Sequence, residues 1–348
     1  MLEIGPQHTL NYRHDILSPL FDYIQSTESC FLIGAGSMGK TRLLDHLMRQ
    51  DVQQNYLGEQ ANKTLLIRMD MNRISELSEW GIYELGLTSL LQTGGLQPEL
   101  EKFAKDSIND LLKPLLDRPD TLKALRYLEL TIGGICRQNN FKLCFVFDEF
   151  DEAYRQLPAK VFAHLRAIRD ANKNQLSYTV FLRNLPHCLR PPADHESFYE
   201  LLSRNLIGIG PYNLTDANEM LRQLEARRSL FIQLPNTREN LFRVSGGHPG
   251  LLQALFGLLK ETPEGDPHLV NTNWLIGQEP VKEECRKLFE SLTNEERQSL
   301  TDFVHGRVTM LSPDMHKGLL IKGLLKPEDQ TTFRVFSPIF NLYLQKLP

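Results

Sequence analysis

From Leu10 to Asn213 the chain alternates short, almost wholly apolar runs with longer stretches of helical periodicity. Apolar runs of this length are typical of strands covered on both faces, as in a parallel sheet flanked by helices. The alternation therefore predicts an α/β fold with a mainly parallel sheet. Strands are expected at 30–33, 64–69, 143–147, 178–182 and 206–209, and helices at 15–25, 42–49, 79–92, 99–116 and 121–138.

After Pro211 the strand signal stops and helical periodicity continues alone. Helices are expected at 216–228, with Thr215 as the N-cap, and at 237–244 and 250–259. A stretch with proline and glycine at 261–267 predicts a linker. The rest of the pattern predicts three helices and a hairpin, and this combination is typical of a winged helix-turn-helix. Its signals are a helix at 284–292, a capping box at Thr293–Glu296, a helix at 313–322 capped by Ser312, and paired strands at 323–326 and 332–336.

Length and composition narrow the class of protein. A chain of 348 residues predicts two or three packed units, and a formal charge of −4 argues against coating nucleic acid by bulk charge. Its apolar runs are too short to span a membrane, and the N-terminus lacks a signal-peptide pattern. The chain has five cysteines, an odd number, and none of them is in a C-x-x-C motif. This pattern predicts reduced thiols in a cytoplasmic protein.

The strongest chemical signal is Gly34-Ala35-Gly36-Ser37-Met38-Gly39-Lys40-Thr41, a complete G-x-x-x-x-G-K-[ST] match between a predicted strand and a predicted helix. Glycines let successive backbone N–H groups turn toward phosphate oxygens, and the helix N-terminus adds its positive dipole end. We expect Lys40 to reach the outer phosphates, Thr41 to offer its hydroxyl to Mg²⁺, and the other loop residues with Arg42 to line the nucleotide. A chance match in a Gly-rich turn is the alternative, which the flanking elements argue against.

A second signal is the apolar strand at 143–147, which ends in Asp148 and Glu149. Beside a phosphate-binding loop, such a pair has two uses: Asp148 holds Mg²⁺, and Glu149 orients or deprotonates the attacking water. Acidic pairs at strand ends are also common as solvated surface features. The pair at 148–149 is informative because a phosphate-binding loop precedes it in the sequence. Asp70 and Asn72 follow another strand and either line this site or simply end the strand. Asp151 and Glu152 are expected to be surface or gate residues.

The P-loop, the segment Phe145-Val146-Phe147-Asp148-Glu149-Phe150-Asp151 and the segment Ser245-Gly246-Gly247-His248-Pro249-Gly250 together resemble the STAND class of signalling ATPases within the AAA+ superfamily. There is also some similarity to origin-recognition-type AAA+ ATPases. The resemblance covers nearly the whole chain. It implies an ATPase core at 1–212, a helical lid at 213–262, a linker at 263–279 and a winged helix at 280–348.

The resemblance also implies roles for further residues. Gly247-His248-Pro249 matches the G-x-P element of the lid, which places Pro249 near the adenine and His248 near the phosphates. A helix break with proline in the first turn is the alternative. Arg183 matches the sensor position, although Asn184 follows it directly and both side chains are candidates to face the phosphate. For Arg183 the alternative is a solvent-facing arginine at a strand end.

Two more arginines fit the family pattern less completely. Ser203-Arg204 is similar to the element that supplies an arginine finger to a neighbouring subunit; a charge complementing a helix end is the alternative. Arg13 lies in a segment similar to the motif flanking the adenine, but Tyr12 replaces the usual glycine before it. If Arg204 is a finger, the active form is a nucleotide-dependent homo-oligomer.

Two classes of function follow for an ATP- or ADP-binding, Mg²⁺-dependent ATPase of this type. In the first, the protein is a nucleotide-gated switch or assembly platform read by protein partners. In the second, it is a DNA-associated ATPase that contacts duplex DNA through the winged helix. The helix at 313–322 offers only Lys317 and Lys322, and the wing carries Glu328 and Asp329, so the sequence favours the switch.

Overall fold

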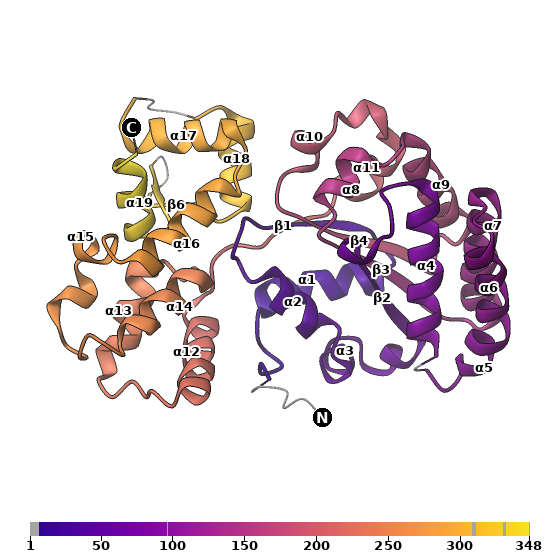
Figure 1. Ribbon diagram of the computed structural model, residues 1–348, viewed down its shortest axis with the longest axis horizontal. Helices are drawn as coiled ribbons and strands as arrows, with labels where there is room; N and C mark the ends of the chain where they lie inside the picture. The colour runs from indigo at the N-terminus through magenta and orange to yellow at the C-terminus, as the bar shows by residue number, and fades with distance from the viewer. Residues whose placement is uncertain (1–6, 96, 308–310, 330–331, 348) are drawn as a thin grey trace. The chain divides into compact units, whose positions relative to one another are not determined.

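The structure is a computed structural model of the chain and describes residues 7–95, 97–307, 311–329 and 332–347. The chain divides into two compact units. Unit 1 comprises 1–16, 33–46 and 208–348, and unit 2 comprises 17–32 and 47–207. The helices and strands of both units are labelled in Figure 1.

Unit 2 carries a five-stranded parallel sheet with the strand order β2-β3-β4-β1-β5. The order of strands in the sheet differs from their order in the chain, as crossover connections through helices require. All five strands lie within two residues of their predicted bounds, which confirms the α/β fold. The strands are β1 Cys30–Ile33, β2 Thr64–Asp70, β3 Lys142–Asp148, β4 Leu176–Leu182 and β5 Leu206–Gly208.

Helices cover this sheet in layers. Helix α4 (Glu79–Gly94) packs on β2, and α7 (Thr121–Gly133) packs on α4 in turn (Figure 1). The helix predicted at 99–116 is instead α5 (Glu101–Phe103), a π-helical turn at 104–108 and α6 (Asn109–Asp117), and a second π-helical turn at 134–138 extends α7. The two segments meet closely, because a β-carbon on Gly134 would lie 2.7 Å from the Phe103 ring. The remaining helices are α1 His14–Gln25, α3 Gln50–Leu57, α8 Asp151–Gln156, α9 Ala159–Ala171, α10 Pro186–Leu189 and α11 Glu196–Ser203.

Unit 1 is mainly helical. It holds α2 (Lys40–Leu47) and the predicted lid helices, which are α12 Leu214–Arg228, α13 Pro235–Ser245 and α14 Pro249–Leu258. The N-cap of α12 is Asn213, whose side-chain oxygen accepts from Asp216 N at 2.9 Å, so the prediction of Thr215 was wrong. The predicted linker contains a 3₁₀ turn at Pro267–Val270 and the short helix α15 at Thr272–Leu275, capped by Asn271.

The C-terminal region, residues 279–345, contains the predicted helices and hairpin. They are α16 Glu279–Glu290, α17 Asn294–Val304, α18 Pro313–Ile321, β6 Leu325–Pro327 and β7 Phe333–Val335. The capping box at Thr293 and the Ser312 cap are both present. Helix α19 (Pro338–Gln345) was not predicted; its buried face packs on α13, α15 and α17. The winged-helix assignment itself stays a prediction.

Four cysteines are buried and one, Cys188, is exposed, and all five are free thiols. Burial raises the pKa of the Cys136 and Cys285 thiols to about 12, which keeps them protonated and unreactive. Among the helices in the described ranges, none combines the length and apolarity needed to cross a lipid bilayer.

Candidate functional site

The loop after β1 has the backbone geometry of an anion-binding loop. Ser37 and Gly39 have φ angles of 57° and 81° on either side of Met38. Alternation of left-handed and right-handed residues is the backbone pattern that forms anion-binding concavities of N–H groups in proteins. A side chain at Gly39 would be disfavoured by the positive φ and crowded, because a β-carbon there would lie 2.8 Å from the Tyr212 hydroxyl; Pro249 Cγ would be in ordinary contact with it at 3.7 Å. The loop leads directly into α2, whose first residues are Lys40 and the exposed Thr41.

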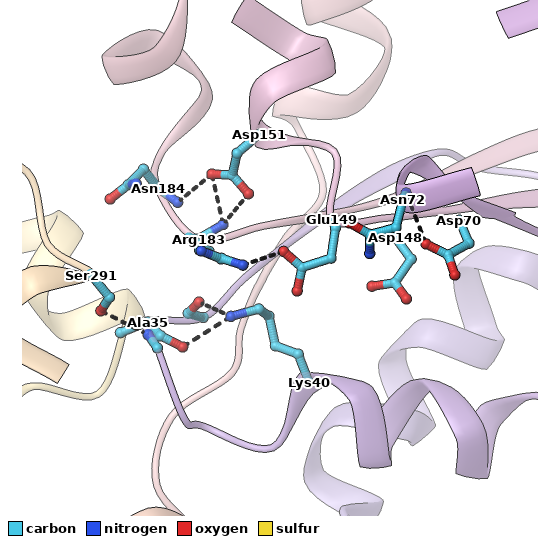
Figure 2. A network of polar contacts seen from close by, with 12 residues as sticks. Ala35, Lys40, Asp70, Asn72, Asp148, Glu149, Asp151, Arg183, Asn184 and Ser291 are labelled. Carbon is cyan, nitrogen blue, oxygen red and sulfur yellow. Dashed lines mark hydrogen bonds and ion pairs between the residues drawn. The ribbon is translucent and has the colours of Figure 1, made fainter. Parts of the chain in front are cut away.

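Lys40 lies against the backbone of its own loop (Figure 2). Its Nζ donates to the carbonyl oxygens of Gly34 at 2.7 Å and Ala35 at 3.0 Å. These bonds hold the ammonium group against the backbone of the loop. A cation beside a glycine-rich loop and a helix N-terminus is the combination that phosphate binding requires.

In unit 2, strand β3 ends in the two predicted carboxylates. The Asp148 side chain is 7% exposed and accepts from Arg68 Nη2 at 2.8 Å. Burial raises the pKa of Asp148, while the Arg68 guanidinium opposes that shift. Asp70 lies opposite Asp148 in the strand register, and its carboxylate accepts from Asn72 N at 3.0 Å, capping the turn after β2.

Glu149 adopts a left-handed conformation, with φ at 51°. This region costs a non-glycine residue about 1 kcal/mol, and such conformations cluster at functional sites. Its carboxylate forms an ion pair with Arg183 Nη2, and Figure 2 shows the two side chains directed toward each other. The strand-end arginine therefore contacts the proposed base within unit 2.

Asp151, predicted to be a surface or gate residue, holds the loop that carries Arg183. Its two carboxylate oxygens both accept from Arg183 N at 3.0 Å, and Oδ1 also accepts from Asn184 N at 3.3 Å (Figure 2). Asn184 is buried, whereas the Arg183 side chain is 48% exposed. Asp151 thus positions Arg183 through the backbone.

His248 joins the predicted lid to the loop within unit 1. Its Nδ1 caps α14 by accepting from Leu251 N at 3.2 Å, so the neutral ring carries its proton on Nε2. That Nε2 donates to the Gly36 carbonyl at 3.4 Å. The side chain is fully buried, and burial lowers its pKa to about 4. His248 and Pro249 therefore form both a helix start and a contact surface for the loop.

The depressed pKa of His248 predicts that stability depends on pH. Because the folded chain disfavours the charged ring, its contribution to stability is complete above pH 6.5 and is lost as pH falls toward about 4. We expect wild type to lose about 3 kcal/mol more stability across this range than His248→Asn, which keeps an N-capping side chain but cannot titrate. Urea unfolding at several pH values measures the difference, and equal losses in the two proteins would contradict the assignment.

The three remaining predicted arginines lie in different surroundings. Arg13 is 1% exposed: its Nη2 donates to Gly210 O at 2.9 Å, its guanidinium lies 5.1 Å from the Tyr212 ring centroid, and its backbone N donates to Asp216 Oδ1 at 3.1 Å. Arg204 is exposed and ends helix α11. Arg42, in the first turn of α2, is half-buried.

Among the residues that contact the predicted ones, Arg68, Tyr212 and Ser291 were not themselves predicted. Arg68 is the one basic residue in β2, and a basic residue two positions before the strand-end Asp70 was a usable signal. Ser291 Oγ accepts from Gly36 N at 2.8 Å, and nothing in the sequence around either residue indicates this contact.

The sequence matches no family model and no curated protein. The fold is similar to that of a Walker-type ATPase of Pyrococcus abyssi, with a TM-score of 0.56 and 16% identity over 98% of this chain and 99% of that one. It is also similar to the ADPNP–ADP complexes of the ORC2 protein of Aeropyrum pernix, with a TM-score of 0.50 and 13% identity over 99% and 96% of the chains. For the ADP form of ORC2 the TM-score is 0.51, with 12% identity over 98% of this chain and 94% of that one. These similarities confirm the AAA+-like P-loop fold, whereas the STAND class stays a prediction.

Proposed function

We propose that the protein binds ATP and hydrolyses it slowly or on stimulation by a partner. The observation that carries this proposal is the glycine-rich loop with its left-handed residues, its lysine and the helix that follows. Along the chain, β1 leads directly into this loop, and within unit 2 the strand β3 ends at Asp148. Parallel strands bring their carboxyl ends to one edge of a sheet, which is where such folds bind ligands.

In this proposal the phosphates lie on the amides of the loop, residues 34–41, with Lys40 neutralising the outer oxygens. Arg42 follows in the first turn of α2, where a cation faces the bound polyphosphate. His248 and Pro249 close over the nucleotide from the lid. The contacts of Gly39 and Gly36 with this part of unit 1 support that arrangement.

The residues present suit Mg²⁺, since a hydroxyl and a carboxylate are the hard oxygen donors it prefers. Thr41 would contribute its hydroxyl and Asp148 its carboxylate; Arg68 already gives that buried carboxylate a compensating cation. When bound, the ion neutralises charge on the transferring phosphoryl group. No cluster of three His, Cys, Asp or Glu side chains forms a metal site in the described residues, and a P-loop site needs none.

Glu149 is the proposed general base, and Arg183 is the proposed sensor. Their ion pair supports Arg183 rather than Asn184 in this role, because the Arg183 guanidinium contacts the proposed base, whereas Asp151 holds Asn184 through its backbone amide. On this proposal the guanidinium leaves Glu149 to stabilise charge on the γ-phosphate, freeing the carboxylate to accept a proton from water. Arg204, exposed at the end of α11, is the proposed finger for a neighbouring copy of the chain.

Arg13 keeps its proposed place beside the base of the nucleotide. Its Nη1 is buried and has no hydrogen-bond partner among the described residues. A buried N–H of a charged group without a partner costs free energy, so an acceptor atom beside it would be stabilising. The choice of adenine over guanine rests on the family resemblance, since the sequence contains no clear Asn-Lys-x-Asp guanine-binding motif.

We further propose that nucleotide controls shape and that protein partners read it, in the cytoplasm. Charges in the C-terminal region support this over DNA binding. Lys322, one of two candidate phosphate contacts on 313–322, is fully buried in an ion pair with Glu296 at 2.7 Å. Lys317 and Arg334 remain exposed, alongside Glu328 and Asp329. DNA-associated function is the second candidate, because the helix-turn-helix predicted for this region is a common DNA-binding motif.

Gel-shift titration of the full chain with duplex DNA separates the two candidates. We expect no binding tighter than micromolar near physiological salt, because neutralising phosphates takes several basic residues on one face. Micromolar or tighter binding that is lost in a Lys317→Glu, Arg334→Glu double variant would instead establish the DNA-associated role. An exposed pair from unit 2, Lys113→Glu with Arg126→Glu, is the charge-matched control.

A further inference from the structure

The peptide groups of Gly36 are bound from two sides by residues far away in the chain. Ser291 Oγ lies 2.8 Å from Gly36 N, and His248 Nε2 lies 3.4 Å from Gly36 O. All three residues belong to unit 1, and Figure 2 shows Ser291 directed at the backbone of the loop. The loop is therefore held by the lid through its carbonyl and by the C-terminal region through its amide.

The Ser291 hydroxyl has a fixed orientation. Its O–H donates to Leu288 O at 2.7 Å, one turn back in α16, which leaves the oxygen lone pairs for the loop. Gly36 N–H donates to that oxygen. Ser291 thus presents to the loop what a phosphate presents, an oxygen acceptor without a competing proton.

Packing leaves no spare room at this contact. A β-carbon on Gly36 would lie 2.8 Å from Ser291 Cβ, 2.9 Å from its Oγ and 3.5 Å from Lys287 O. The last turn of α16 therefore touches the loop backbone directly. A phosphate oxygen on the Gly36 amide would have to take the place of the Ser291 hydroxyl.

We propose that Ser291 is an internal competitor for phosphate at the P-loop, and that nucleotide binding displaces the end of α16. The proposal rests on the proposed nucleotide site and names the element through which that site acts. Helix α16 packs on α14 of the lid and on α19. Helix α19 is joined to the lid in turn, because Ser337, its N-cap, donates to Val244 O at 2.9 Å. Movement of α16 would therefore affect the lid and the C-terminal region together.

Two substitutions in the full chain test the competition in opposite directions. Ser291→Ala removes the acceptor, and we expect ADP and ATP to bind about fivefold more tightly, the effect of one hydrogen bond. Ser291→Asp offers the amide an anionic oxygen, and we expect nucleotide to bind about tenfold more weakly. Ser312→Ala is the matched control, because it removes a helix-capping hydroxyl from the same region. We expect this variant to bind ADP and ATP with wild-type affinity.

Hydrogen exchange gives a second readout that mere destabilisation would not reproduce. In wild type, ADP should speed exchange of the Ser291 amide, which donates to Lys287 O in the last turn of α16. In Ser291→Ala the amide of residue 291 should exchange fast even without nucleotide, and ADP should change its rate little. In Ser312→Ala the ADP response should remain.

The results separate this inference from the proposed function. Lys40-dependent nucleotide binding with the same affinity in wild type, Ser291→Ala and Ser291→Asp would overturn the competition and leave the nucleotide site intact. A chain that binds no nucleotide with either serine or alanine at this position would overturn both. Opposite shifts in the two variants support the proposal.

Discussion

Lys40→Ala should reduce nucleotide affinity about a hundredfold or more. The ammonium group is held against the backbone of the loop by the Gly34 and Ala35 carbonyls, where it offers charge-assisted hydrogen bonds to phosphate. Losing two such bonds costs about 3 kcal/mol or more, and about 1.4 kcal/mol corresponds to a factor of ten in Kd. Equilibrium binding of fluorescent ATP and ADP analogues measures the change.

The matched control is Lys113→Ala, which removes an exposed lysine from α6 in unit 2. It should bind nucleotide like wild type. A cooperative thermal unfolding transition establishes that the Lys40→Ala protein is folded. Unchanged ATP affinity in a folded Lys40→Ala protein would contradict the assignment of the loop.

Glu149→Gln should stop ATP turnover while leaving nucleotide affinity within about threefold of wild type. A general base accelerates proton transfer about 10²- to 10⁴-fold, and glutamine cannot accept the proton. The amide oxygen of glutamine still accepts from Arg183, so the local structure should persist. Release of phosphate under saturating ATP measures turnover, with binding measured in parallel on the same preparation.

Glu152→Gln provides the control for this substitution. Glu152 lies three residues away on α8, is exposed, and pairs with Arg155 at 2.9 Å. It should hydrolyse ATP at the wild-type rate. If Glu149→Gln turned over ATP normally, or if both variants lost activity equally, Glu149 would not be the base.

The sheet and the loop were predictable because their signals are local. Each strand is nearly all apolar, as burial on both faces demands, and the P-loop glycines stand where a side chain would clash or a positive φ is needed. The carboxylates at Asp148 and Glu149 follow directly from the strand that carries them. Each of these features is determined by residues that are consecutive in the sequence.

The wrong N-cap and the contacts that were not predicted also have physical explanations. Asn213 and Thr215 are both good N-caps two residues apart, and sequence alone does not decide between them. The contact between Gly36 and Ser291 joins residues 255 positions apart, and a serine after a helix is an ordinary C-terminal residue. Asp151 was expected to be a surface or gate residue, and its hydrogen bonds to the Arg183 and Asn184 amides were not predictable because every sequence contains backbone amides.

Every role proposed for this protein requires that the chain bind one nucleotide through the loop at residues 34–41. Calorimetric titration of the full chain with MgATP and with ADP measures that binding. We predict saturable binding of one nucleotide per chain, lost in Lys40→Ala and retained in Lys113→Ala. Absence of saturable binding to a folded wild-type chain, or binding that survives the loss of Lys40, would contradict the claim.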